Sequence, residues 1–240
     1  MGDGATGTLY VVGTPIGHLQ DITLRALEVL KGSDLIAAED TRRTQKLLAA
    51  YDLHVPLTSF HEHNQQAKAP RLVERLRQGQ TISLVTDGGT PGISDPGREL
   101  VRQAREAGLP VVPVPGPSAA VCALSVCGWG ADAFTFLGFL PRRKSRRRRL
   151  LQEMATQDRL VVLYESPFRL KALLTEMYDE LGDVEILMTR EMTKIHEEIR
   201  SSRVSELITA LGERIVKGEI TLVVRPDRGL KSEEPEWNES

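Results

Sequence analysis

A glycine-rich stretch, residues 87–97 (DGGTPGISDPG), is the part of this sequence with the clearest chemical potential. It follows the apolar run 81–86, which predicts a buried strand. Its four glycines let the backbone come close to a ligand, and the carboxylates of Asp87 and Asp95 offer hydrogen-bond acceptors for hydroxyl or amine groups. Because open α/β sheets bind ligands at the carboxyl ends of their strands, we interpret the stretch as a binding loop rather than a plain connection.

Two further proline–glycine turns follow predicted strands, at residues 13–17 (GTPIG) and 115–119 (PGPSA). Neither contains the GxGxxG pattern of dinucleotide-binding loops or the GK[ST] ending of a P-loop, which disfavours nicotinamide and nucleoside-triphosphate chemistry. Ser118 and Ala119 begin a predicted helix, where backbone N–H groups are open to a ligand. We expect the three turns to converge on one edge of one sheet.

Two polar clusters could act on a substrate at the same edge. Residues 39–43 (EDTRR) stand at a strand-to-helix junction, and they are either a helix cap with solvated arginines or an acid–base and phosphate-binding element. Residues 61–64 (HEHN) have no third ligand at a spacing suited to a metal, so we favour polar substrate contact or simple surface over a metal site.

Alternating apolar runs and amphipathic segments supply the framework for these residues. Strands are predicted over 9–12, 35–38, 81–86 and 111–114, with helices over 23–31, 41–48, 70–78 and 98–107 between them. Pro70 is expected to open its helix, and either Asp40 or Thr41 to cap the helix before it. This β–α alternation predicts a mostly parallel, doubly wound sheet.

A second α/β unit starts near the apolar run 134–140. Its predicted strands are 160–164, 184–189 and 220–224, and its predicted helices are 146–155, 168–181 and 204–211. We therefore predict an α/β domain over residues 1–119, a second over 120–228 and a disordered acidic tail over 229–240, with a cleft between the two domains. Glu165 and Arg190, at strand ends of the second domain, line the cleft or form a structural ion pair.

The charge of the chain is unevenly distributed. Lys and Arg number 31 against 33 Asp and Glu, a formal net charge of −2, which by itself argues against a nucleic-acid partner. Residues 142–149 (RRKSRRRR), however, are basic at every position except Ser145. Unrelieved like charges repel one another, so this block indicates a polyanion partner more than a solvated helix face; a nuclear-localisation signal is the competing interpretation.

Several classes are excluded by composition. No apolar run reaches the roughly 18 residues that a membrane-spanning helix needs, and no secretory signal is visible at the start of the chain. Cys122 and Cys127 lack a CxxC spacing and are expected to be reduced, buried, small apolar side chains in a cytoplasmic protein. No metal is expected.

Segments of this sequence, taken in order, resemble the tetrapyrrole-methylase-like (class III) S-adenosylmethionine-dependent methyltransferases. They span almost the whole chain: LYVVGTPIGHLQDIT, DLIAAEDTRRT, DGGTPGISDPG, PVPGPSA, GFLPRRKSRR, YESPFR, TREMTK and KGEITLVV. The EDTR segment, the FHEHN segment and the basic stretch after GFLP resemble the subgroup that acts on ribosomal RNA. The stretch at 87–89 reads DGG where the family often has DAG, a minor departure.

The resemblance implies a fold, a cofactor and a partner. The fold is two α/β domains with the cofactor, S-adenosylmethionine, in the cleft between them, and the protein is a homodimer. The substrate is a cytidine in the decoding centre of small-subunit (16S) rRNA, methylated on its ribose 2′-oxygen. The cofactor-binding residues it implies are Pro15, Asp87, Gly88, Gly89, Thr90, Ile93, Ser94, Asp95, Ser118, Ala119, Tyr164, Arg190 and Thr221.

A ribose hydroxyl is a weak nucleophile, so a general base is expected to assist it. The candidates are Glu39, Asp40 and His61, with Arg42 binding phosphate. The RNA-binding candidates are Arg142, Arg143, Lys144, Arg146, Arg147, Arg148 and Arg149. Two alternatives remain: a small-molecule tetrapyrrole methylase, which leaves the basic block unexplained, and a non-catalytic RNA-binding module on the same fold.

Overall fold

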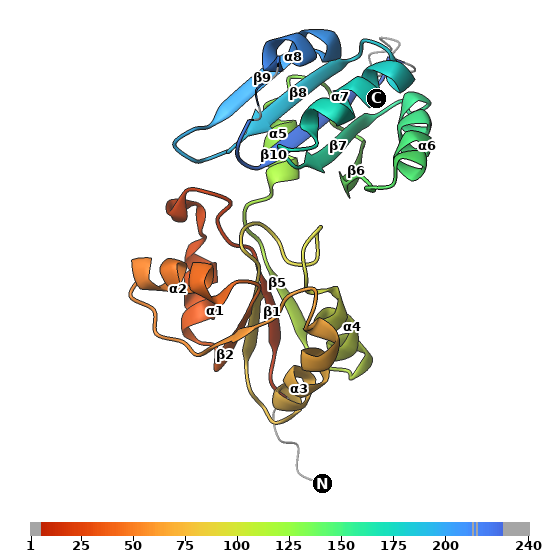
Figure 1. The fold of residues 1–240 in the computed structure, drawn as a ribbon. Coiled ribbons are helices and arrows are strands. Elements are labelled where there is room, and N and C mark those ends of the chain that lie inside the picture. Colours follow the sequence, from red (N-terminus) through yellow and green to blue (C-terminus); the bar gives the residue numbers. More distant parts are fainter. Residues whose placement is uncertain (1–5, 213, 215, 228–240) are drawn as a thin grey trace, which may run out of the picture. The chain divides into compact units, whose positions relative to one another are not determined.

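The chain divides into two compact units, Met1–Ser118 and Ala119–Ser240, each built around its own five-stranded sheet (Figure 1). The structure, a computed structural model, describes residues 6–212, 214 and 216–227. The acidic tail predicted over 229–240 therefore lies outside the described residues. In the described part of the chain, no helix has the length and apolar character needed to cross a bilayer.

The sheet of the first unit is entirely parallel, with strand order β3-β2-β4-β1-β5. Its strands are β1 (Leu9–Val12), β2 (Leu35–Ala38), β3 (Leu57–Ser59), β4 (Ile82–Val85) and β5 (Val111–Val114). Because all five strands run in one direction, the segments that follow them emerge along one edge of the sheet. This confirms the predicted parallel α/β architecture.

Helices cover both faces of this sheet (Figure 1), because successive side chains of a strand point to opposite sides. Along β2, Leu35 and Ala37 pack in the cluster that contains residues of α3 and α4, whereas Ile36 and Ala38 pack in the cluster with α1 and α2. The helices are α1 (Leu24–Lys31), α2 (Thr41–Ala50), α3 (Gln65–Arg77) and α4 (Arg98–Glu106), with a 3₁₀ turn, η1, at Leu19–Asp21.

Helix α3 differs from the sequence prediction, because it begins at Gln65 and has Pro70 inside it. The chain turns into the helix at Asn64, whose carbonyl accepts hydrogen bonds from the N–H groups of Ala67 and Lys68. Proline has no N–H to donate to the carbonyl one turn earlier, that of Gln66. Gln66 and Pro70 are both exposed, so water can satisfy that carbonyl.

The second unit contains a mixed sheet of order β6-β7-β10-β8-β9, in which β6 and β7 are parallel and the other neighbours antiparallel. Its strands are β6 (Phe134–Phe139), β7 (Leu160–Glu165), β8 (Glu185–Arg190), β9 (Glu198–Arg203) and β10 (Ile220–Arg225). Strand β9 was not predicted from the sequence, because its only apolar residue is Ile199.

Side chains of β7 also point alternately to the two faces of its sheet, and each face packs in its own apolar core. Val161 and Leu163 pack with residues of α6, α7 and α8, and Leu160 and Val162 pack against α5. The helices are α5 (Ala119–Ser125), α6 (Lys144–Ala155), α7 (Leu170–Leu181) and α8 (Val204–Leu211). Both cysteines are free thiols; Cys127 is buried beside α5 as predicted, but the predicted burial of Cys122 is wrong, because this side chain is only half-buried.

Candidate functional site

The glycine-rich loop after β4 is tied to the turn after the neighbouring strand β1. Thr14 and Gly89 exchange backbone hydrogen bonds, with N···O distances of 3.0 and 2.9 Å. A side chain at Gly88 would place its Cβ 2.9 Å from the carbonyl oxygen of Pro15, closer than real contacts allow. The loop and the turn therefore pack backbone against backbone, which requires glycine at this point.

The turn after β5 joins the same contact. A Cβ on Gly13 would lie 2.7 Å from the Cα of Gly116, and a Cβ on Gly116 would lie 2.8 Å from the Cα of Gly13. Ser118 ends this turn, and Ala119 is the first residue of α5. The expected convergence of three proline–glycine turns on one sheet edge is thus present within the first unit.

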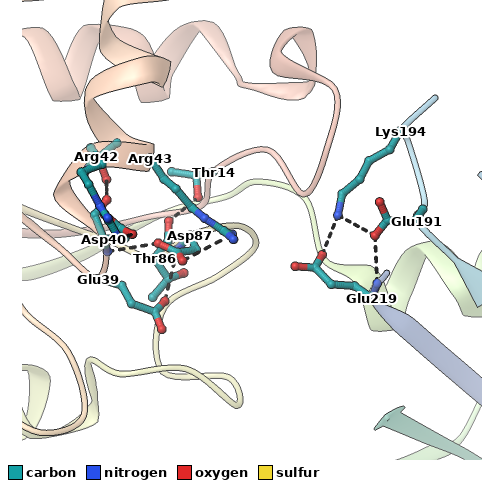
Figure 2. A network of polar contacts seen from close by, with 11 residues as sticks. Thr14, Glu39, Asp40, Arg42, Arg43, Thr86, Asp87, Glu191, Lys194 and Glu219 are labelled. Atoms are coloured by element: carbon teal, nitrogen blue, oxygen red, sulfur yellow. Dashed lines mark hydrogen bonds and ion pairs between the residues drawn. The ribbon is translucent and has the colours of Figure 1, made fainter. Parts of the chain in front are cut away.

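A buried hydroxyl lies at the start of the glycine-rich loop. The Thr14 hydroxyl donates a hydrogen bond to the carbonyl oxygen of Thr86 at 3.1 Å (Figure 2). The hydroxyl of Thr86 is itself buried, and among the described residues it has no hydrogen-bond partner. Unpaired buried polar atoms are costly, so this oxygen fits contact with a polar ligand.

The rest of the loop is more open. Ile93 and Ser94 are exposed, Thr90 and Asp95 are half-buried, and Ser94 has a φ of 62°, which is strained for a residue other than glycine. Strained backbone is concentrated at ligand-binding segments, so the geometry of Ser94 agrees with the predicted role of the loop.

The segments that follow β2 and β4 are joined by reciprocal hydrogen bonds, each from a backbone N–H to a carboxylate oxygen. The backbone N–H of Asp87 donates to Oε2 of Glu39 at 3.2 Å, and the backbone N–H of Asp40 donates to Oδ1 of Asp87 at 3.1 Å (Figure 2). Burial raises the pKa of Glu39, and the nearby Asp87 charge raises it further, against the lowering effect of the Asp87 N–H. Glu39 is thus a half-buried carboxyl group at the sheet edge.

Asp40 occupies a different environment, since it caps α2 and is paired with Arg42. Its Oδ1 accepts hydrogen bonds from the Arg42 backbone N–H at 2.9 Å and from Nε at 3.1 Å, and Oδ2 lies 2.7 Å from Nη2. The Arg42 side chain holds the pKa of Asp40 far below its usual range. Arg43, beside it, lies 3.4 Å from Oδ2 of Asp87.

His61 follows β3 at the same edge and is oriented by Asn64. The backbone N–H of His61 donates to Oδ1 of Asn64 at 2.9 Å, so the Asn64 amide nitrogen faces Nε2 of the ring, also at 2.9 Å. An amide nitrogen only donates, which makes Nε2 an acceptor and places the ring proton on Nδ1. Nδ1 is buried with no partner among the described residues.

The four catalytic candidates therefore lie along the ends of adjacent strands, Glu39, Asp40 and Arg42 after β2 and His61 after β3. The Phe60 N–H donates to the Ala38 carbonyl at 2.6 Å and continues the β2–β3 pairing up to this point. In the described part of the chain, no three His, Cys, Asp or Glu side chains gather in a manner suited to a metal ion.

Of the predicted cofactor residues in the second unit, Ala119 begins α5, and the other three lie on the adjacent strands β7, β10 and β8: Tyr164, Thr221 and Arg190. Thr221 of β10 is buried and opposes Tyr164 of β7 on one side and Thr189 of β8 on the other. The Tyr164 ring makes edge contacts with Phe136 and Phe139, with centroids 5.0 and 5.7 Å apart.

Arg190, at the end of β8, is held within the second unit. Its Nε donates to Glu198 at 2.9 Å and its Nη1 to the Lys217 carbonyl at 3.0 Å. The alternative of a Glu165–Arg190 ion pair is wrong, because Glu165 pairs with Arg169, four positions later in the chain, at 3.0 Å.

One cluster in the second unit joins residues of the TREMTK and KGEITLVV segments, whose contact with each other was not predicted from the sequence. Oε1 of Glu191 accepts hydrogen bonds from Lys194 Nζ at 2.9 Å and from the Glu219 backbone N–H at 2.8 Å, and Lys194 also reaches Oε2 of Glu219 at 2.9 Å (Figure 2). Burial alone would lower the pKa of Lys194, but the two carboxylates outweigh it and raise the pKa. Glu191 has a φ of 50°, which no sequence pattern indicated.

The basic block contains three kinds of side chain. Arg142, Arg143, Lys144 and Arg146 are exposed and form no ion pair with a described residue. Arg148 pairs with Glu180 and Arg149 with Glu153, yet 63% and 75% of their side chains stay exposed. Arg147 is only 13% exposed and pairs with Glu176.

Comparison with known proteins identifies the family. The family described as Tetrapyrrole (Corrin/Porphyrin) Methylases matches residues 8–208. A protein of Halalkalibacterium halodurans named ribosomal RNA small subunit methyltransferase I is 45% identical over 98% of this chain and 81% of its own length. The Bacillus subtilis protein of the same name is 43% identical over 100% of this chain and 82% of its own length.

Solved structures show the same fold. A cobalt precorrin-4 methyltransferase superimposes with a TM-score of 0.67 over 90% of this chain and 94% of its own, at 18% identity. The chain belongs to the tetrapyrrole methylase family and, within it, groups with the proteins named ribosomal RNA small subunit methyltransferase I.

Proposed function

We propose that this protein methylates small-subunit (16S) rRNA, transferring a methyl group from S-adenosylmethionine to the ribose 2′-oxygen of a cytidine in the decoding centre. The observation that carries the proposal is similarity at 45% identity over 98% of the chain to a relative with that rRNA methyltransferase name. The exposed basic side chains at the start of α6 support an RNA substrate over a small tetrapyrrole, because they match a phosphate backbone.

The glycine-rich loop fits the cofactor. Its backbone is packed too closely at Gly88 for any side chain, which leaves main-chain groups on its surface, and the buried Thr86 hydroxyl has no described partner. We propose that Pro15, Asp87–Thr90, Ile93, Ser94, Asp95 and Ser118 hold the cofactor in the first unit, and Ala119, Tyr164, Arg190 and Thr221 in the second. When bound, S-adenosylmethionine supplies an electrophilic methyl group on a sulfonium.

Among the three candidate bases, the geometry favours Glu39. One of its oxygens accepts a hydrogen bond from Asp87 N–H, and Oε1 receives none from the described residues. Burial raises its pKa, which brings the carboxylate closer in basicity to what a general base needs near neutral pH. Glu39 therefore accepts the 2′-hydroxyl proton as the ribose oxygen attacks.

The other candidates take supporting roles in this proposal. Asp40 is a poor base because its carboxylate is paired with Arg42, which lowers the pKa of Asp40 and so weakens its affinity for a proton. Arg42, whose side chain is 86% exposed, offers N–H groups to a phosphate. His61 has its acceptor nitrogen occupied by Asn64, so the imidazole acts as a donor through Nδ1 and not as a base.

Nucleoside analysis tests the proposal directly. The purified protein, labelled S-adenosylmethionine and either naked 16S rRNA or assembled small subunits are incubated, and the RNA is digested to nucleosides for mass spectrometry. We expect label in 2′-O-methylcytidine from a decoding-centre fragment. Label on a base, or methylation of a uroporphyrin-type substrate instead of RNA, overturns the proposal.

Two further parts of the proposal follow from the same assignment. We also propose that the protein works in the cytoplasm and that it is the homodimer implied by the family resemblance, which sedimentation velocity tests. The non-catalytic alternative predicts RNA binding without affinity for S-adenosylmethionine, which calorimetry of the purified protein distinguishes.

A further inference from the structure

Two arginines hold the peptide that leads into the basic block. Nη2 of Arg169 donates to the carbonyl oxygen of Leu140 at 2.8 Å, and Nη1 of Arg147 donates to the carbonyls of Pro141 and Arg142, both at 3.0 Å. Three consecutive carbonyls, between the end of β6 and the start of α6, are thus fixed by two side chains. We call these residues, 140–142, the tethered peptide.

Both arginines are themselves held by carboxylates of the second unit. Arg147 makes a two-point contact with Glu176 of α7, with Nε and Nη2 each 2.6 Å from a carboxylate oxygen. Arg169 lies 3.0 Å from Oε2 of Glu165, whose side chain is fully buried and whose Oε1 accepts from the Ser166 N–H at 2.6 Å. Arg147 thus commits Nε and Nη2 to Glu176 and Nη1 to two carbonyls, which leaves it few N–H groups for an outside anion, whereas Arg169 makes both of its contacts through Nη2.

The cations next to the tethered peptide have the opposite character. Arg142, Arg143, Lys144 and Arg146 are exposed, and no described carboxylate pairs with them. Their backbone starts at or directly after the tethered peptide, so its conformation decides where these side chains project. A peptide fixed during folding does not have to be ordered again when a partner binds.

We propose that Arg147 and Arg169 are positioning residues that fix the tethered peptide and thereby direct the exposed cations of the block toward RNA phosphates. The inference rests on the proposed rRNA substrate, and it revises the sequence prediction that every basic residue of 142–149 contacts RNA. Arg147 acts through the backbone of its neighbours, and Glu176 and Glu165, although acidic, contribute to RNA binding by holding the two arginines.

Charge changes at Arg147 and Glu176 separate this role from direct phosphate contact. Glu176→Gln removes a negative charge, Arg147→Gln removes a positive charge, and the double variant leaves the net charge unchanged. If Arg147 contacts phosphate, Glu176→Gln frees it and tightens RNA binding, while Arg147→Gln weakens binding and lowers the salt slope by about one. If Arg147 positions the peptide, all three variants weaken binding by a similar factor, roughly tenfold.

The measurement is fluorescence anisotropy of a labelled decoding-centre transcript of small-subunit rRNA, titrated with each full-length variant at several salt concentrations. Arg147→Lys keeps the charge but loses the two-point contact, and we expect it to bind as weakly as Arg147→Gln. Near-native melting temperatures and unchanged affinity for S-adenosylmethionine confirm that each variant is folded. Arg147→Lys serves as the deciding variant if Glu176→Gln melts too low to assay.

Glu180→Gln is the matched control. Glu180 lies on α7, pairs with Arg148 and accepts from Gln152 of α6 at 2.9 Å, but it holds no carbonyl of the tethered peptide. Glu180→Gln removes one negative charge, as Glu176→Gln does, and we expect its RNA affinity to be equal to or slightly above that of the unaltered protein.

The binding and methylation results test the positioning role and the proposed function separately. Tighter binding by Glu176→Gln, or unchanged binding by both Arg147 variants, overturns the positioning role. If the unaltered protein binds the transcript but yields no 2′-O-methylcytidine, the proposed function fails while the positioning result is still decided by the binding data. If the unaltered protein does not bind the transcript, both fail together.

Discussion

The carboxylate of Glu39 accepts a hydrogen bond from the backbone N–H of Asp87 at 3.2 Å, joining the segments that follow β2 and β4. Asp87 opens the glycine-rich loop, so a catalytic candidate and the proposed cofactor loop are fixed to one another inside the first unit. The reverse bond, from the Asp40 N–H to Asp87 Oδ1, makes the link two-sided. A shift of either segment is therefore transmitted to the other.

Glu39→Gln is expected to lower kcat by about 100-fold or more, the range that loss of a general base produces. Glutamine keeps an oxygen that accepts the Asp87 N–H, so the loop and the affinity for S-adenosylmethionine should be preserved. Single-turnover methylation of 16S rRNA and calorimetry of cofactor binding provide the two measurements. A variant that keeps kcat within threefold of the original would mean that catalysis relies on positioning alone.

The pH dependence of methylation should follow the ionisation of Glu39. Burial, with the Asp87 charge, raises the pKa of Glu39 above its ordinary value of 4.5. Only the ionised carboxylate accepts a proton, so kcat should rise with pH through that raised pKa and then level. Asp87→Asn removes a negative charge that raises the pKa and should move the rising limb to lower pH, measured with saturating cofactor. If the rise of kcat moves to higher pH in Asp87→Asn, the result contradicts the assignment of Glu39 as the general base.

Much of this arrangement was readable in the sequence, because its signals are local. The four-residue apolar runs at 9–12 and 35–38 are strands, and the proline–glycine turns after β1, β4 and β5 meet as the parallel alternation predicted. A strand of three half-buried residues, β3, and an edge strand with one apolar residue, β9, gave no such signal. Their pairing with neighbours supplies the stability that their composition does not indicate.

Pairings between distant residues account for what the sequence did not reveal. Arg147 stands in a run of like charges, and nothing local shows that Glu176, 29 positions later, lies on the adjacent helix. Glu165 pairs with Arg169 and not with Arg190 because of the turn into α7. Arg169 follows Glu165 by four positions, and the turn brings its Nη2 to 3.0 Å from Oε2 of Glu165. Charge patterns predict that a partner exists, and tertiary structure decides which one.

Gly88→Ala should disturb the cofactor loop. The added Cβ would lie 2.9 Å from the Pro15 carbonyl oxygen and 3.2 Å from the Ile16 Cα, so one segment must move. We expect a loss of about 1–3 kcal/mol in the free energy of unfolding and at least tenfold weaker S-adenosylmethionine binding. Thermal denaturation and calorimetry measure the two effects.

Gly130→Ala provides the comparison for that variant, since its Cβ would come no closer than 4.0 Å to Asp132 Oδ2. It should leave both quantities unchanged. If Gly88→Ala behaves like Gly130→Ala, the loop is not as closely packed as the geometry requires.

Replacing the exposed cations should change RNA binding without changing the fold. Arg142, Arg143, Lys144 and Arg146 form no ion pair with a described residue, so glutamine at all four positions removes charge without breaking an ion pair. If each cation contacts one phosphate, the slope of log affinity against log salt should fall by roughly three, since each contact contributes about 0.7–0.9. Melting temperature and S-adenosylmethionine affinity should stay as they were. An unchanged salt slope would place the RNA surface elsewhere, because a cation that neutralises a phosphate cannot be removed without releasing fewer counterions on binding.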